Sequence, residues 1–98
     1  IDWLMTPNDN IVNQCPFIYT IRVKNGKRND LRSHLTNLSI DTGIHWQPGH
    51  KFQYFQNERK NDLKITEKIS DQIITLPLHT NMKYEEIDYI VKSIKEFL

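Results

Sequence analysis

Two histidines and a tryptophan, the residues of this chain best suited to contacting a ligand, lie within six positions of one another. His45 and Trp46 are adjacent, and His50 follows after Pro48 and Gly49. An alternating apolar pattern typical of a strand precedes them, and loops at strand ends often carry binding residues. The imidazoles can donate hydrogen bonds to a phosphorylated or hydroxylated ligand, and the indole can stack on a sugar or a base. A strand end with a packed Trp46 and solvated histidines explains the same pattern, and spacing alone does not decide between them.

The sequence does not indicate other kinds of reactive site. The remaining histidines, His34 and His79, are distant from this segment, and no cysteine or acidic pattern completes a tetrahedral metal site, so no metal is expected. We expect His34 on the exposed side of its helix. No serine lies in a Gly-x-Ser-x-Gly turn, and the three glycines stand apart, which excludes a glycine-rich phosphate loop. Cys15 is the only cysteine, so an internal disulfide is excluded.

Composition narrows the possible partners. The chain has 98 residues, enough for one domain with its own core. Thirteen Lys and Arg nearly balance twelve Asp and Glu, and they are spread along the chain, so we expect no nucleic-acid partner. We also expect no membrane association, because no apolar run is long enough to span a bilayer. A lone cysteine is typical of a reducing compartment, so we expect a cytoplasmic location. The chain begins with isoleucine, which suggests a piece of a longer protein.

Apolar periodicity predicts an α+β fold in two layers, with a small, mainly antiparallel three-stranded sheet and helices on one face. The predicted strands span residues 17–23, 40–46 and 73–78, and the predicted helices span residues 27–38, 65–69 and 84–98. Residues 1–16 are expected to connect a missing upstream domain to a domain formed by residues 17–98. Four aromatic residues exceed the needs of one small core and are expected to pack partly against another domain or subunit: Trp3, Phe52, Tyr54 and Phe55.

Several motifs occur together in a characteristic order. They are Ile21-Arg22-Val23, Leu31 with Leu35, Ser39-Ile40-Asp41-Thr42-Gly43-Ile44-His45-Trp46 with His50, Leu76-Pro77-Leu78-His79, and Glu85-Glu86-Ile87-Asp88-Tyr89-Ile90-Val91. In this order, the chain resembles the C-terminal domain of the DegT/DnrJ/EryC1/StrS family of pyridoxal-phosphate-dependent sugar aminotransferases. The resemblance covers nearly all of the chain from Phe17 onward.

The resemblance implies the small C-terminal domain of a fold-type I aminotransferase that works as a homodimer. Such enzymes move an amino group, typically from glutamate, onto a keto-sugar linked to a nucleoside diphosphate, often for lipopolysaccharide or other surface polysaccharide. The family's His-Tyr pair falls on His45 and Trp46, and its second histidine falls on His50. We therefore expect these three residues to bind substrate and none to be catalytic. The family's Schiff-base lysine and its acidic partner belong to the upstream domain, so pyridoxal 5'-phosphate is expected in the full-length protein only, and this chain alone is expected to be inactive.

The chain departs from the family pattern at three notable positions. Trp46 replaces the commoner tyrosine. Ser39 stands where glycine usually ends the helix, which costs about 1 kcal/mol if the residue is left-handed. Lys83 stands where serine or threonine commonly caps the last helix, which forgoes about 1 kcal/mol. Two alternatives stay open: a pyridoxamine-phosphate-dependent sugar dehydratase of the same family, and a non-catalytic interaction module.

Overall fold

The computed structural model describes residues 2–7, 13–55 and 62–97. Its centre is a three-stranded antiparallel sheet in the order β1 (Leu4–Met5), β2 (Tyr19–Val23) and β3 (Ile73–Leu76). Ile21 lies opposite Ile74, and Leu4 lies opposite Val23, so these side chains share one face of the sheet. Thr20 and Thr75 lie on the other face, with their hydroxyl oxygens 3.4 Å apart.

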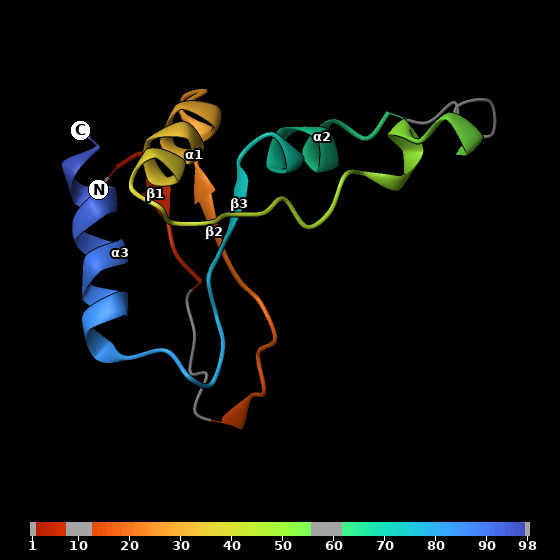
Figure 1. Ribbon diagram of the computed structural model, residues 1–98. Helices are drawn as coiled ribbons and strands as arrows, with labels where there is room; N and C mark the ends of the chain where they lie inside the picture. The colour runs from red at the N-terminus through yellow and green to blue at the C-terminus, as the bar shows by residue number, and fades with distance from the viewer. Residues whose placement is uncertain (1, 8–12, 56–61, 98) are drawn as a thin grey trace.

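Two helices, α1 (Arg28–Asn37) and α3 (Tyr84–Glu96), cover the apolar face of the sheet (Figure 1). The shorter α2 (Lys64–Ser70) lies beyond the start of β3, and two 3₁₀ turns, η2 (Gly49–Lys51) and η3 (Gln53–Phe55), precede it. The buried apolar core is Trp3, Ile21, Val23, Leu31, Leu35, Ile40, Ile74, Ile90 and Ile94. The α+β prediction is thus confirmed. Among the described residues, no helix has the length and apolar character that crossing a bilayer requires.

The third strand is not the one that the sequence predicted. Residues 40–46 form no strand, and only Gly43 pairs with Thr75, through two backbone hydrogen bonds of 2.8 and 3.0 Å. The side chain of Arg32 draws the segment toward α1, because its guanidinium donates to the hydroxyl and the carbonyl oxygen of Thr42, both at 3.1 Å. Pairing therefore does not extend beyond one bridge.

The missing strand comes from the segment that was expected to be only a connection. Leu4–Met5 pair with the end of β2, and the Trp3 carbonyl accepts a hydrogen bond of 2.7 Å from the Lys24 backbone N–H. Trp3 is 7% exposed and packs edge-on against Phe97. The beginning of the chain is therefore part of the domain core, and Trp3 is not surplus. Residues 8–12 of the expected connection lie outside the described residues.

The end of α1 confirms the conformation suspected for Ser39. Its φ is +60°, in the left-handed region. The backbone N–H of Ser39 donates to the Thr36 carbonyl at 3.0 Å, and that of Ile40 donates to the Leu35 carbonyl at 2.9 Å. These two bonds form a Schellman motif, and the buried side chains of Leu35 and Ile40 complete it. The chain therefore leaves α1 at Ser39 and continues into the segment that carries His45 and Trp46.

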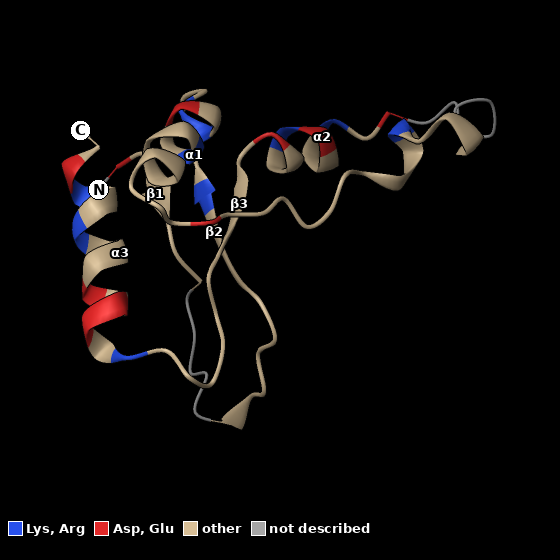
Figure 2. Cartoon of the chain, in the orientation of Figure 1, with Lys and Arg blue, Asp and Glu red and all other residues tan. Residues whose placement is uncertain are grey.

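The last helix has an ordered charge distribution, with acidic residues in its first turn and lysines in its later turns (Figure 2). This arrangement favours the helix dipole. The lysine at the N-cap has no acceptor in its side chain, but the Glu86 carboxylate accepts a 2.8 Å hydrogen bond from the Lys83 backbone N–H. Ile90 and Ile94 are buried, whereas Ile87 and Val91 on the same helix are exposed. Part of the apolar surface of α3 is therefore uncovered.

Residues 44–55 and 62–70, here called the arm, project from the body formed by the sheet, α1 and α3 (Figure 1). The Cα radius of gyration is 15.4 Å, against about 13 Å for a compact domain of this length. Phe52, Tyr54 and Phe55 on the arm are exposed, as is Ile65. The arm has no buried hydrophobic residue among its described positions, so its shape depends on a few polar contacts.

Candidate functional site

The segment with His45 and Trp46 forms the base of the arm. It is attached to the sheet by the Gly43–Thr75 bridge and to α1 by the Arg32–Thr42 contacts. The peptide bond between His45 and Trp46 is cis. The bridge and the arginine contacts come from two different elements, so they fix the segment immediately before the two side chains.

The imidazole of His45 folds back over Gly43. A Cβ on Gly43 would collide with that ring, including its Nδ1 at 3.0 Å, so glycine is what permits the approach. The ring of Trp46 lies edge-on to that of His45, with centroids 5.3 Å apart and planes at 69°. Trp46 is 63% exposed. The interpretation of Trp46 as a packed strand residue is therefore wrong for this structure, in which the indole is largely exposed to solvent.

His50 is turned toward α2. Its Nε2 lies 3.0 Å from Oε1 of Glu67, and its side chain is only 16% exposed. This contact joins the two limbs of the arm across 17 residues of sequence. A carboxylate oxygen only accepts, so Nε2 carries the hydrogen, and a neutral imidazole then leaves Nδ1 as an acceptor. The structure thus brings His45 and Trp46 together and gives His50 a bracing contact of its own.

A hollow of about 400 Å³ opens beside Trp46, in the angle between the arm and the body. Arg28, at the start of α1, and Lys51, at the end of η2, line it together with Trp46. Sequence reasoning missed both basic residues, because they come from elements outside the His-Trp motif. Neither His45 nor His50 lines this hollow.

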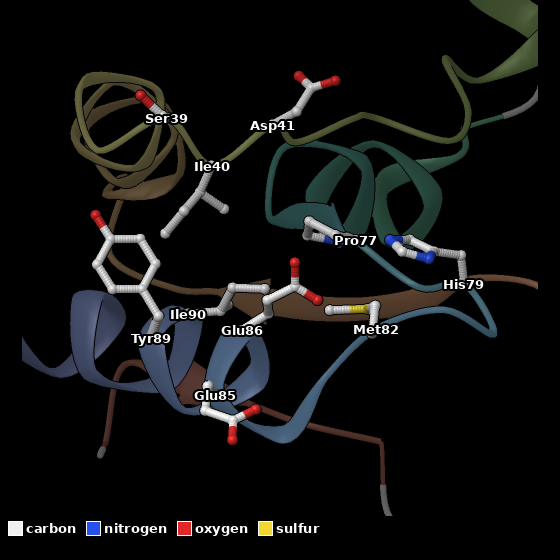
Figure 3. Close-up of a pocket in the computed structure, with 10 residues that line it drawn as sticks. All are labelled: Ser39, Ile40, Asp41, Pro77, His79, Met82, Glu85, Glu86, Tyr89 and Ile90. Atoms are coloured by element: carbon white, nitrogen blue, oxygen red, sulfur yellow. The ribbon is translucent and has the colours of Figure 1, made fainter.

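A second hollow, of about 370 Å³, lies between the end of α1 and the start of α3 (Figure 3). Asp41, Glu85 and Glu86 line it, and their carboxylates point in different directions. His79 lies at its edge. Like charges repel phosphate, so this hollow does not suit an anionic ligand. Across the described ranges, no cluster of three or more His, Cys, Asp or Glu side chains is placed to hold a metal ion.

The prediction that His34 lies on the exposed side of its helix is wrong. Its Nε2 is 2.9 Å from the Ser93 carbonyl oxygen, and its ring packs at 5.5 Å from that of Phe97. His34 therefore joins α1 to α3. The side of α1 that carries His34 would be exposed to solvent in an isolated helix, but α3 packs against it here. His34 is therefore part of the structure of the body.

The lysines of the described residues are all exposed or half-buried. A lysine that forms a Schiff base is activated by burial or by a neighbouring cation, and none of the described lysines is buried. The Nζ of Lys27 lies 5.8 Å from the centroid of the Trp3 ring, a cation–π contact over the core.

Two curated relatives are similar to most of the chain. One is the dTDP-3-amino-3,6-dideoxy-alpha-D-galactopyranose transaminase of Aneurinibacillus thermoaerophilus, which is 26% identical over 82% of this chain and 22% of its own length. The other is the UDP-4-amino-4-deoxy-L-arabinose–oxoglutarate aminotransferase of Shewanella sediminis, which is 30% identical over 72% of this chain and 20% of its own length. The chain thus spans about a fifth of the length of these relatives.

The fold is also found in solved structures. The crystal structure of the aminotransferase TlmJ from Streptoalloteichus hindustanus matches with a TM-score of 0.82 at 16% identity, over 99% of this chain and 26% of that one. The family model of DegT/DnrJ/EryC1/StrS aminotransferases matches residues 3–95, which includes β1 and the whole arm. This confirms the resemblance seen in the sequence: the chain belongs to the DegT/DnrJ/EryC1/StrS aminotransferase family, whose aminotransferases use pyridoxal phosphate.

Proposed function

We propose that this chain is the C-terminal domain of a pyridoxal-phosphate-dependent aminotransferase that acts on nucleotide-linked keto-sugars. In this proposal, His45, Trp46 and His50 form part of the substrate side of the pocket. The upstream domain supplies the cofactor site and its lysine, glutamate supplies the amino group, and the full-length protein is a cytoplasmic homodimer. The product is an amino sugar for surface polysaccharide. The names of both relatives, which pair a nucleoside diphosphate with an amino sugar, support this substrate class.

The observation that carries the proposal is the open indole of Trp46 beside the imidazole of His45. Trp46 is 63% exposed, and burial of its apolar ring against a ligand would be favourable. The short attachments through Gly43 and Thr42 hold the pair at a fixed place, as a binding site requires. His50 contributes through its contact with Glu67, which fixes the loop that follows Trp46.

The exposed apolar surfaces support the proposal that this chain is one domain of a larger protein. An apolar groove of about 310 Å³ between β3 and α3 is lined by Tyr19, Leu76, Leu78, Ile87 and Val91. The aromatic residues of the arm are exposed as well. Surfaces of this kind are normally buried against a neighbouring domain or subunit. In the proposal, the upstream domain and the second subunit provide that burial.

The test uses the intact polypeptide that contains this chain. Addition of pyridoxal phosphate is expected to produce an internal-aldimine absorbance band, and glutamate with a nucleotide-linked keto-sugar is expected to yield 2-oxoglutarate. Trp46→Leu should raise the KM for the sugar nucleotide about tenfold, because a stacked ring contributes about 1–3 kcal/mol. His79→Ala, which removes an exposed histidine of the acidic hollow, is the matched control and should leave KM unchanged.

Two results would contradict the proposal. If the intact polypeptide binds no pyridoxal phosphate, the enzyme assignment fails. If Trp46→Leu and His79→Ala leave the same KM, the segment does not contact substrate. A product that has lost a hydroxyl group and gained no amino group would identify the dehydratase alternative.

A further inference from the structure

Residues 43–50, here called the His-Trp segment, contain His45, Trp46 and His50, and none of these residues is buried. A segment without buried side chains gains little order from apolar packing. The position of its exposed rings therefore depends on polar contacts at the two ends of the segment. Those contacts come from two different helices.

The first end of the His-Trp segment is held by α1. The guanidinium of Arg32 donates from Nε to the Thr42 hydroxyl and from Nη2 to the Thr42 carbonyl oxygen, both at 3.1 Å. Two bonds from one planar group to one residue fix direction as well as distance. Thr42 directly precedes the segment, and Gly43 is bridged to Thr75 on the sheet. Arg32 and this bridge therefore set the direction in which the chain leaves the body.

The far end of the segment is held by α2. Nε2 of His50 donates to Oε1 of Glu67 at 3.0 Å, and the two side chains are 16% and 46% exposed, so water screens this contact only in part. The end of α2 is in turn joined to α1, because Nη1 of Arg28 donates to the Ser70 carbonyl oxygen at 3.3 Å. His50 is thus connected to the body through α2.

Both limbs of the arm lead back to the same side of α1. Arg28 and Arg32 are four positions apart on this helix, so their side chains leave it on one side. Arg32 holds the limb that leaves the body, and Arg28 holds the limb that returns. Fixing both ends of a short segment lowers the number of conformations that it can adopt. A ligand that binds such a segment then loses less entropy.

We propose that Arg32 and Glu67 are positioning residues for the sugar-nucleotide substrate, each holding one end of the His-Trp segment without touching the substrate. Neither residue lines the hollow beside Trp46, so Arg32 acts through Thr42 and Glu67 acts through His50. The proposal rests on the proposed function, in which the His-Trp segment contacts the substrate. It extends substrate recognition to contacts made by α1 and α2.

The test measures steady-state kinetics of the intact polypeptide with saturating glutamate and a varied concentration of a nucleotide-linked keto-sugar. Arg32→Met and Glu67→Ala should each raise the KM for the keto-sugar about threefold to tenfold, the effect of losing partly exposed hydrogen bonds, and leave kcat unchanged. Glu67→Gln keeps an oxygen that can accept the bond from His50 and should restore the original KM. Arg32→Lys keeps the charge and one donor at a time, so it should raise KM less than Arg32→Met. The reaction with glutamate alone, followed by the absorbance of the bound cofactor, should keep its rate in every variant.

Glu96→Ala is the control, because it removes an exposed carboxylate whose partner, Lys92, lies on α3 away from the arm. Equal KM values for Glu67→Ala and Glu96→Ala would overturn the proposal. A fall in kcat and in the glutamate reaction that accompanies the rise in KM would also overturn it, because this pattern indicates a general loss of structure. These outcomes leave the proposed function intact. Absence of amino transfer by the original polypeptide, in contrast, would refute the proposed function and this inference together.

Discussion

Ser39→Gly is expected to stabilise the domain. Ser39 occupies the left-handed position that ends α1, where a side chain costs about 1–2 kcal/mol relative to glycine. Glycine also makes the unfolded chain more flexible, which lowers the stability of the folded state by about 0.4–1 kcal/mol. The Ser39 side chain is exposed and has no hydrogen-bond partner among the described residues, so no contact is lost. The net gain should be about 1 kcal/mol, which raises the melting temperature of a domain of this length by about 4–8 °C.

Urea unfolding of the 98-residue chain, followed by far-UV circular dichroism, measures this change as a higher midpoint at constant slope. Ser39→Ala keeps the Cβ and should give no gain. Ser33→Gly, at an exposed position inside α1, should destabilise, because glycine is a poor helix former. A midpoint for Ser39→Gly at or below that of the original chain would refute the assigned cost of the left-handed serine.

Three further changes follow from the site and the last helix. Gly43→Ala should displace the His45 ring, which is measured as a change in the ¹H and ¹³C shifts of that imidazole, whereas Gly49→Ala has open space and should leave them unchanged. Glu67→Ala should speed amide hydrogen exchange in η2 and α2, because it removes the bond to His50 that joins the limbs of the arm. Lys83→Ser should stabilise α3 by about 0.5–1 kcal/mol in urea unfolding, since a hydroxyl can cap the helix and an ammonium cannot.

Each of these predictions has a result that contradicts it. An unchanged His45 spectrum in Gly43→Ala would mean that the ring does not lie over the glycine. Exchange rates that respond equally to Glu67→Ala and to Glu96→Ala would show that the brace is no stronger than the exposed pair between Lys92 and Glu96, whose atoms are 3.8 Å apart. A lower midpoint for Lys83→Ser would mean that the lysine stem contributes more through packing than a new cap does.

The main elements of the body could be predicted because their apolar spacing is regular over several turns or residues. The strand ending at Val23, the helix through Leu31 and Leu35, and the strand through Ile74 all lie within a few residues of their expected limits. A strand of two residues, such as β1, is too short to show a period. The alternation in residues 40–46 is real, but Ile40 is buried because it is part of the Schellman motif, and alternation alone does not create a pairing partner.

The site could be predicted only in part. Its location followed from the types and spacing of His45 and Trp46, and the family match covers that segment. The hollow beside Trp46 depends on Arg28, 18 positions earlier in the chain, and the brace of His50 depends on Glu67, 17 positions later. Contacts of this kind depend on how the elements pack in three dimensions, so no local sequence pattern predicts them.

The position of β1 determines where this unit can be excised. The composition of residues 1–16 invites a cut at residue 16, but such a truncation would remove Trp3 and leave one edge of β2 without its neighbour. Loss of a buried tryptophan typically costs about 3–5 kcal/mol, and an unpaired edge exposes backbone groups that can recruit a strand from another molecule. Aggregation of a protein shortened in this way would therefore be a consequence of the lost edge strand.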